Sequence, residues 1–263
     1  NFYVAYSTVK HIVPPWLYSI ICLPYLYKTY KREKFDILRI HSPRFLGIAG
    51  IIFHFFYPNV PILASAVTVD DSNLFFPIEK ALFNISKKII VQSGYMKKRL
   101  VKRFNIAPKK IEITYGGALD SERKWTHVPK EAQKLSPLDP VILFMGMLVA
   151  RKNPLFLVEL FSKSKVKVKN LKLVIIGTGP LKKIIQKQLE AKGLLADTIF
   201  VNEAFAQDKN YWFSRMDIFI FPSLDEGFGL AVTEAMSFAK PVITSNKAAF
   251  KEIITSGKDG YTL

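Results

Sequence analysis

Short apolar runs recur along the chain, and each is followed by a longer amphipathic segment. Apolar runs of this kind predict buried strands, and the segments between them predict helices. The runs do not alternate apolar with polar residues, so both faces of each sheet should be covered, as in parallel sheets. We expect strands at residues 36–40, 61–67, 88–91, 110–114, 141–145, 171–176, 198–201, 218–221 and 241–244. We expect helices at residues 75–84, 95–104, 154–162, 180–191, 209–215, 230–237 and 248–254.

The alternation of strands and helices falls into two series separated by a polar, proline-bearing stretch at 120–140. Alternation of this kind is typical of doubly wound α/β lobes. We therefore predict an α/β chain of two Rossmann-like lobes, with a first lobe at 1–125, a linker at 126–139 and a second lobe at 140–263. Ligands of such sheets bind beyond the carboxyl ends of the strands, which predicts a ligand cleft between the lobes.

The most apolar stretch of the chain, residues 12–27, is interrupted by Pro14, Pro15 and Pro24. It falls short of the roughly 20 apolar residues that a transmembrane helix needs, and it lacks the architecture of a signal peptide. We interpret it as a buried helix of the first lobe, with membrane contact as the alternative. The chain starts without a first strand and stops inside an apparent strand, so we expect a fragment that lacks part of each end.

The chain of 263 residues carries a formal net charge of +17. Most of the excess lies in the first half, which contains the basic run of residues 97–103 followed by Lys109 and Lys110. This run is either a solvated helix face or a surface for anionic lipid or an anionic acceptor. It lies in no known nucleic-acid-binding motif, so we expect no nucleic-acid partner. The single cysteine, Cys22, excludes an intramolecular disulfide and fits a cytoplasmic protein, peripheral at most to the membrane.

The segment from Phe221 to Met236 combines a strand, a glycine-bearing loop and a helix. Its glycines allow backbone N–H groups to approach a ligand, and a helix start at Leu230 favours a phosphate. Glu226 lies in the loop and Glu234 follows in the helix, with seven residues between them. Two carboxylates beside an anion site are good acceptors for hydroxyls. A ligand with sugars on either side of a phosphate fits this pattern.

This segment resembles the Glu–seven residues–Glu motif of the GT-B retaining glycosyltransferases of family 4. Segments 144–153, 173–180, 241–246 and 257–260 are similar to further elements of the same donor-binding lobe, and 90–93 and 113–120 are similar, less specifically, to the acceptor lobe. The resemblance implies transfer of a sugar from a nucleoside-diphosphate sugar to a glycan, lipid-linked or small-molecule acceptor, with retention. It implies a hexosyltransferase-like enzyme that needs no metal and no cofactor.

The resemblance also implies roles for individual residues. Glu226 would bind hydroxyls of the transferred sugar, Glu234 would bind the ribose, and Lys152 would neutralise the departing diphosphate. The catalytic positions carried over are Glu226, Lys152 and Asp70. The donor-binding positions are Gly146, Met147, Arg151, Lys152, Gly177, Phe205, Glu226, Gly227, Phe228, Gly229, Leu230 and Glu234.

Two positions depart from the family pattern. Met147 stands where the family usually has an arginine, with Arg151 four residues further on. Asp70 stands where the family often has a histidine. These departures motivate the alternative of a non-catalytic nucleotide-sugar-binding protein or partner subunit. A dinucleotide oxidoreductase is disfavoured because Gly177-Thr178-Gly179 lacks the third glycine and the acidic partner of that fingerprint.

Overall fold

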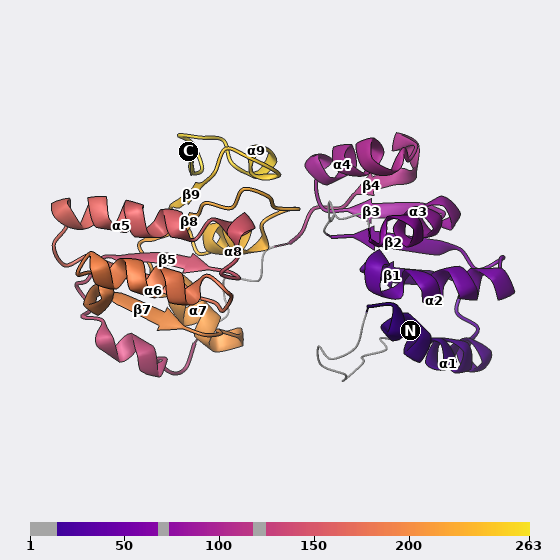
Figure 1. The fold of residues 1–263 in the computed structure, drawn as a ribbon, viewed down its shortest axis with the longest axis horizontal. Coiled ribbons are helices and arrows are strands. Elements are labelled where there is room, and N and C mark those ends of the chain that lie inside the picture. Colours follow the sequence, from indigo (N-terminus) through magenta and orange to yellow (C-terminus); the bar gives the residue numbers. More distant parts are fainter. Residues whose placement is uncertain (1–14, 68–73, 118–124) are drawn as a thin grey trace. The chain divides into compact units, whose positions relative to one another are not determined.

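The computed structural model describes residues 15–67, 74–117 and 125–263. Contacts between residues divide the chain into a first unit, Asn1–Tyr115, and a second unit, Gly116–Leu263. Each unit contains one parallel sheet flanked by helices (Figure 1). None of the described helices is both long enough and apolar enough to span a bilayer.

The first unit has a four-stranded sheet in the order β1-β2-β3-β4. Alternating and continuous apolar residues of the strands pack under the helices, and Ile62, Ile89, Leu82 and Phe83 are fully buried. The strands are β1 Leu38–His41, β2 Ile62–Ala66, β3 Lys88–Val91 and β4 Ile111–Ile113. The helices are α1 Pro15–Glu33, α2 Pro43–Phe56, α3 Phe76–Ile85, α4 Gly94–Phe104 and the short 3₁₀ helix η1 Pro108–Lys110.

Helix α1 differs from the buried helix that the apolar stretch predicts. It packs along α2, but Ile20, Ile21, Tyr25 and Tyr27 on its other side are exposed. Only one face of α1 is buried, although the helix is largely apolar, because α2 is the principal neighbour that covers it. The helix also continues past the apolar stretch through the basic segment that ends at Glu33.

The second unit has a six-stranded sheet in the order β10-β9-β8-β5-β6-β7. The chain winds outward from β5 through β6 and β7, then returns to β8 on the other side of β5 and winds outward again. The strands are β5 Val141–Met145, β6 Lys172–Ile176, β7 Thr198–Val201, β8 Ile218–Phe221, β9 Val242–Thr244 and β10 Tyr261–Thr262. The helices are α5 Leu155–Lys167, α6 Lys182–Ala191, α7 Ala206–Arg215, α8 Leu230–Ser237 and α9 Phe250–Ile253, with 3₁₀ helices η2 Lys130–Lys134, η3 Ala150–Lys152 and η4 Leu195–Asp197.

The winding reverses between β5 and β8, which are paired neighbours. A reversal of this kind leaves a crevice at the carboxyl ends of the two strands, where open α/β sheets bind ligands. The core beneath it is dense in aromatic side chains: Phe144, Trp212, Phe213 and Phe219 are fully buried. The loops that follow β5 and β8 therefore extend from strands that are anchored in a densely packed core.

Much of the polar stretch expected to link the lobes packs on the second unit. Ala132 in η2 is buried in that unit's core. The Arg215 guanidinium donates to the carbonyl oxygens of Ser136 and Asp139 at 2.8 and 2.7 Å. The division between contact units falls at Tyr115, earlier in the chain than the expected boundary at 125.

Candidate functional site

Two loops form the framework of the site, one after β5 and one after β6. The Gly146 N–H donates to the Ile176 carbonyl at 2.9 Å, and the Leu148 N–H donates to the Thr178 carbonyl at 2.8 Å. Gly177 has φ +146°, and a Cβ there would lie 2.0 Å from the Gly146 carbonyl oxygen. Only glycine permits this approach of one backbone to the other. Gly146 and Gly177, both predicted donor-binding positions, thus shape the loops.

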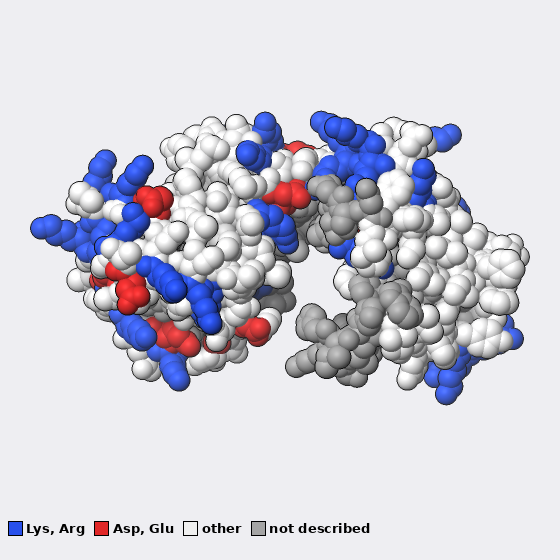
Figure 2. Space-filling model, in the orientation of Figure 1, with Lys and Arg blue, Asp and Glu red and all other residues white. Residues whose placement is uncertain are grey.

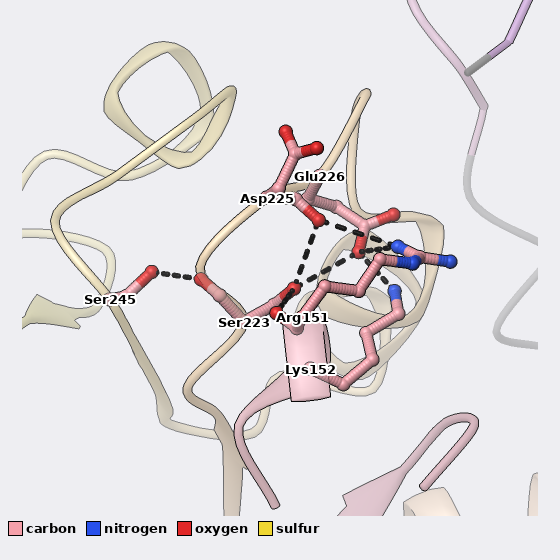
Figure 3. Close-up of polar contacts among 6 residues, drawn as sticks. All are labelled: Arg151, Lys152, Ser223, Asp225, Glu226 and Ser245. Atoms are coloured by element: carbon pink, nitrogen blue, oxygen red, sulfur yellow. Dashed lines mark hydrogen bonds and ion pairs between the residues drawn. The ribbon is translucent and has the colours of Figure 1, made fainter. Parts of the chain in front are cut away.

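Lys152 and Glu226 form the centre of the site (Figure 3). The Lys152 ammonium donates to Glu226 Oε2, joining η3 to the loop after β8. The two side chains are only 10% and 17% exposed. The ammonium also lies 4.7 Å from the centre of the Phe221 ring, which adds a cation–π contact. Two of the three residues expected to be catalytic are therefore brought together, although 74 positions separate them in the sequence.

Burial lowers the pKa of Lys152 below its ordinary value, and the neighbouring Glu226 carboxylate opposes this shift. A desolvated cation interacts with a nearby anion more strongly than a hydrated one, because little water screens it. Lys152 is thus suited to hold a phosphate or a developing negative charge beside the helix start.

Arg151 lies beside this pair. Its Nη1 is 3.9 Å from Glu226 Oε2 and donates to the Asp225 carbonyl at 3.4 Å (Figure 3). The Met147 side chain is 59% exposed. The 3₁₀ helix η3 thus places a second cation beside the Glu226 carboxylate, whereas position 147 carries no charge.

Ser223 is a site residue to which sequence reasoning gave no role. It is fully buried, and its Oγ lies 3.2 Å from the carbonyl oxygens of Arg151 and Asp225 and 3.4 Å from Glu226 Oε2. The Leu224 N–H also donates to the Arg151 carbonyl, at 2.8 Å, and the Ser245 hydroxyl donates to the Ser223 carbonyl. Ser223 therefore holds the loop after β8 against η3 (Figure 3). A buried serine gives no distinct signal within an apolar strand-end sequence.

The start of α8 follows this loop directly. Gly229 caps the helix with φ +97°, and a Cβ there would lie 2.6 Å from the Phe250 ring. Phe228 is buried, whereas Leu230 is partly exposed. The first N–H groups of a helix have no partner within it and carry the positive end of the helix dipole. The segment 227–230 thus places a helix start, which is suited to binding an anion, after the loop that holds Glu226.

Glu234 lies one turn into α8 and pairs with a different cation. Lys209 Nζ, on α7, is 2.8 Å from Glu234 Oε1. Sequence reasoning did not identify Lys209, because nothing in the sequence pairs a lysine with a carboxylate 25 positions later. The two glutamates of the motif are therefore held by two separate lysines.

The remaining predicted positions stand apart from these clusters. Phe205 directly precedes α7, and its side chain is 71% exposed. Asp70 lies outside the described residues. Tyr211, Trp212 and Phe213, interpreted as core rather than as a base-stacking group, are buried. Among the described residues, no three His, Cys, Asp or Glu side chains are grouped so that they could hold a metal ion.

Comparison with known sequences decides the family. The sequence model of the family described as Glycosyl transferases group 1 matches residues 128–263, which is more than half of the chain. The chain belongs to this family. A second model, described as Glycosyltransferase Family 4, matches residues 3–119. The predicted kinship with the group 1 glycosyltransferases is thereby confirmed.

Two curated relatives of this chain are both named as glycosyltransferases. It is 26% identical to EpsD of Bacillus subtilis (strain 168) over 198 residues, covering 72% of this chain and 51% of that protein. It is 31% identical over 170 residues to the N-acetylgalactosamine-N,N′-diacetylbacillosaminyl-diphospho-undecaprenol 4-α-N-acetylgalactosaminyltransferase of Campylobacter jejuni, covering 62% of this chain and 42% of that protein. The chain thus spans about half the length of the curated relatives it matches.

The fold has close counterparts among solved structures. Anabaena HepE, solved in complex with UDP and glucose, superposes with a TM-score of 0.77 over 91% of this chain and 67% of that protein, at 16% sequence identity. At this identity the likeness shows the fold alone. It confirms the predicted GT-B type of α/β fold.

Proposed function

We propose that the protein transfers a sugar from a nucleoside-diphosphate sugar to a glycan, lipid-linked or small-molecule acceptor. The observation that carries this proposal is the buried Lys152–Glu226 pair, which lies beside the start of α8. The family supports glycosyl transfer in general. The diphosphate-linked acceptor in the name of the Campylobacter relative and the UDP and glucose in the HepE complex support the kinds of acceptor and donor.

The site has an acidic group that suits the sugar of such a donor and basic groups that suit its diphosphate. Glu226 accepts hydrogen bonds from hydroxyls of the transferred sugar, and the α8 start with Lys152 and Arg151 binds the diphosphate. Negative charge grows on the diphosphate oxygen as the glycosidic bond breaks, and fixed cations in a dry site stabilise that charge. Because Lys152, Arg151 and the helix start supply this positive charge, the proposed reaction needs no divalent metal.

The proposed reaction retains the configuration of the anomeric carbon. The bond between that carbon and the diphosphate oxygen breaks, and the acceptor hydroxyl oxygen forms its bond from the same face. The hydroxyl proton passes to the departing diphosphate oxygen, and a nucleoside diphosphate is released. NMR of the product tests this stereochemistry, and an inverted anomeric centre would refute the retaining mechanism.

The test of the activity begins with a thermal-shift screen of nucleotide sugars on the full-length protein, since bound donor raises the unfolding temperature by mass action. The donor that stabilises the protein is then used to measure transfer and donor hydrolysis. Glu226→Ala should abolish both, whereas Glu190→Ala, an exposed carboxylate on α6, should leave them unchanged. Full activity of Glu226→Ala would overturn the proposal.

The second candidate is a nucleotide-sugar-binding protein without catalysis, as Met147 and Asp70 suggest. The position of Arg151 weakens half of that argument, because it provides a cation at Glu226 despite Met147. Calorimetry distinguishes the two functions: tight donor binding with no turnover against any acceptor extract would favour the binding protein.

An anionic membrane surface is the partner proposed for the first unit. Tyr25 and Tyr27 on α1 and Phe55 and Phe56 at the end of α2 are exposed; we call these four residues the aromatic edge. The Tyr27 and Tyr57 rings, 6.2 Å apart, join the two helices there. Aromatic side chains flanked by cations are typical of helices that lie in a membrane interface. The exposed cations of α1 and the residue after it are Lys28, Lys31, Arg32 and Lys34.

Charge on the visible face supports this assignment. Figure 2 shows Lys and Arg over the α4 and α1 parts of the first unit, whereas both signs are mixed over the second. Sedimentation with vesicles tests the proposal. Binding should require phosphatidylserine and fall with added salt, and Phe55→Ser with Phe56→Ser should weaken it. Leu138→Ser with Val166→Ser, which removes two exposed apolar residues of the second unit, should leave binding unchanged. Equal binding to neutral vesicles would count against an anionic membrane.

A further inference from the structure

Lys209 and Glu234 form a largely buried ion pair, and Lys209 lies outside the glutamate motif. Lys209 Nζ and Glu234 Oε1 are 2.8 Å apart, and their side chains are 18% and 15% exposed. Lys209 comes from α7 and Glu234 from α8, so the pair depends on the packing of two helices. A pair that is this little exposed is screened less than a surface salt bridge.

Lys209 lies in the first turns of α7, which make several contacts with residues 125–127. The Thr126 hydroxyl donates to Gln207 Oε1 at 2.6 Å, and His127 Nε2 lies 2.7 Å from Asp208 Oδ1. The Trp125 and Tyr211 rings are 5.0 Å apart. These contacts hold the first turn of α7 against residues 125–127, so the lysine approaches Glu234 from a defined direction.

A fixed cation at one carboxylate oxygen limits how the carboxylate can turn. Lys209 is bonded to Oε1, and Oε2 together with the remaining lone pairs can accept hydrogen bonds from a ligand. A ribose presents two neighbouring hydroxyls, and both can be bound only if the carboxylate plane is correctly oriented. A carboxylate free to rotate would lose part of that selectivity to conformational entropy.

We propose that Lys209 is a positioning residue that orients Glu234 for the ribose hydroxyls of the donor, so that the site distinguishes ribose from 2′-deoxyribose. This inference rests on the proposed function, because it takes the donor to be a nucleotide sugar and Glu234 to bind its ribose, as the family resemblance implies. It adds a residue that determines which nucleotides are accepted, and it assigns the selectivity to a lysine outside the glutamate motif.

If the ion pair only holds α7 against α8, a different result is expected. Loss of a purely structural ion pair lowers the stability of the protein and weakens the binding of all nucleotides by the same factor. A positioning role makes the loss depend on the 2′-hydroxyl. The ratio of two dissociation constants measured on the same variant separates the two roles, since a general weakening cancels in the ratio.

The experiment measures calorimetric dissociation constants of UDP and 2′-deoxy-UDP, with the GDP and ADP pairs alongside. The wild type should prefer the ribonucleotide by about tenfold or more, because a hydrogen bond to a charged acceptor is worth at least that factor. Lys209→Met should reduce the preference to within about threefold. Lys209→Arg, which retains the charge, should recover most of it. Lys209→Gln provides a second neutral variant should the methionine variant fail to fold.

The matched control is Lys165→Met. Lys165 forms an ion pair of the same 2.8 Å length with Asp197, and the two side chains are 16% and 24% exposed. Asp197 keeps a second partner in this variant, because Lys172 Nζ lies 2.7 Å from its Oδ1. The variant therefore loses one ion pair of similar length and exposure in the same unit, and it should keep the full preference for ribose. An unchanged preference in Lys209→Met, or a wild type that binds both nucleotides equally, would overturn the inference alone. A wild type that binds no nucleoside diphosphate would overturn the proposed function, and this inference with it.

Discussion

Replacing Lys152 by Met separates the contribution of this side chain to catalysis from its contribution to folding. Methionine matches the length of the lysine stem and retains contact with the Phe221 ring, but it removes the cation. The Lys152 side chain is only 10% exposed, and its pKa is lowered by burial, so the folded protein already bears the cost of desolvating its charge. Removing the charge relieves that cost and at the same time leaves Glu226 without its nearest cation.

The loss of stability should be modest. Removing one partner of a fully buried ion pair costs about 3–5 kcal/mol. Glu226 keeps contacts with Ser223 and Arg151 and is 17% exposed, so we expect about 1–2 kcal/mol for this chain. At roughly 2–4 °C per kcal/mol for a protein of this size, the unfolding temperature should fall by only a few degrees.

The loss of activity should be large. Removing one preorganised group that stabilises charge in the transition state costs about 100- to 1,000-fold in kcat. Release of the nucleoside diphosphate, measured with saturating donor well below the unfolding temperature, reports this loss. Lys152→Arg should retain part of the activity. Lys187→Met, an exposed lysine on α6, should retain all of it.

A kcat of Lys152→Met within about threefold of the wild type would refute the reasoning, because the transition-state term would then be below about 1 kcal/mol. A large loss of activity together with a large fall in unfolding temperature would instead make Lys152 a folding residue. The two readouts therefore test the two parts of the argument separately.

Three further predictions concern pH, backbone and metal. Because burial lowers the pKa of Lys152, kcat/KM should fall with rising pH before an ordinary lysine loses its proton, and the free energy of unfolding should rise over the same range; a pH profile unchanged in Lys152→Met would contradict this. Gly229→Ala should destabilise the protein by about 2–3 kcal/mol through positive φ and collision with Phe250, whereas Gly193→Ala, with open space at its Cβ, should cost about 1 kcal/mol in thermal unfolding. EDTA should leave transfer unchanged; a loss restored by Mg²⁺ would show a metal requirement.

The strands were predictable because their apolar runs have few other possible structures. Strands lie within eight of the nine expected ranges, including the edge strand β4, and β1 overlaps the ninth, extending one residue past it to His41. Helix α2 was not predicted, and its glycines show the reason. A Cβ at Gly50 would lie 2.0 Å from the Ile40 side chain, so this helix needs glycine for close packing although glycine is a poor helix former. Tertiary contact overrode local propensity there.

The site was predictable where its residues fall within one continuous segment. Glu226 and the loop to Leu230 follow a strand and begin a helix, which a sequence pattern reveals. Ser223 lies inside that segment, but its contact with the Arg151 carbonyl spans 72 positions, and Lys209 lies outside the segment, 25 positions before its partner Glu234. Such contacts depend on how helices pack, and no local spacing encodes them.

The backbone contact between Gly177 and Gly146 has a consequence for engineering the donor specificity proposed for this protein. Libraries that vary this protein should hold both glycines constant, because almost any side chain at Gly177 would push the two loops apart. Diversity belongs at Met147 and Phe205, whose side chains are exposed and contribute little to the core. The glycine contact thus separates loop positions of the second unit that should stay constant from exposed positions that can be varied without loss of the fold.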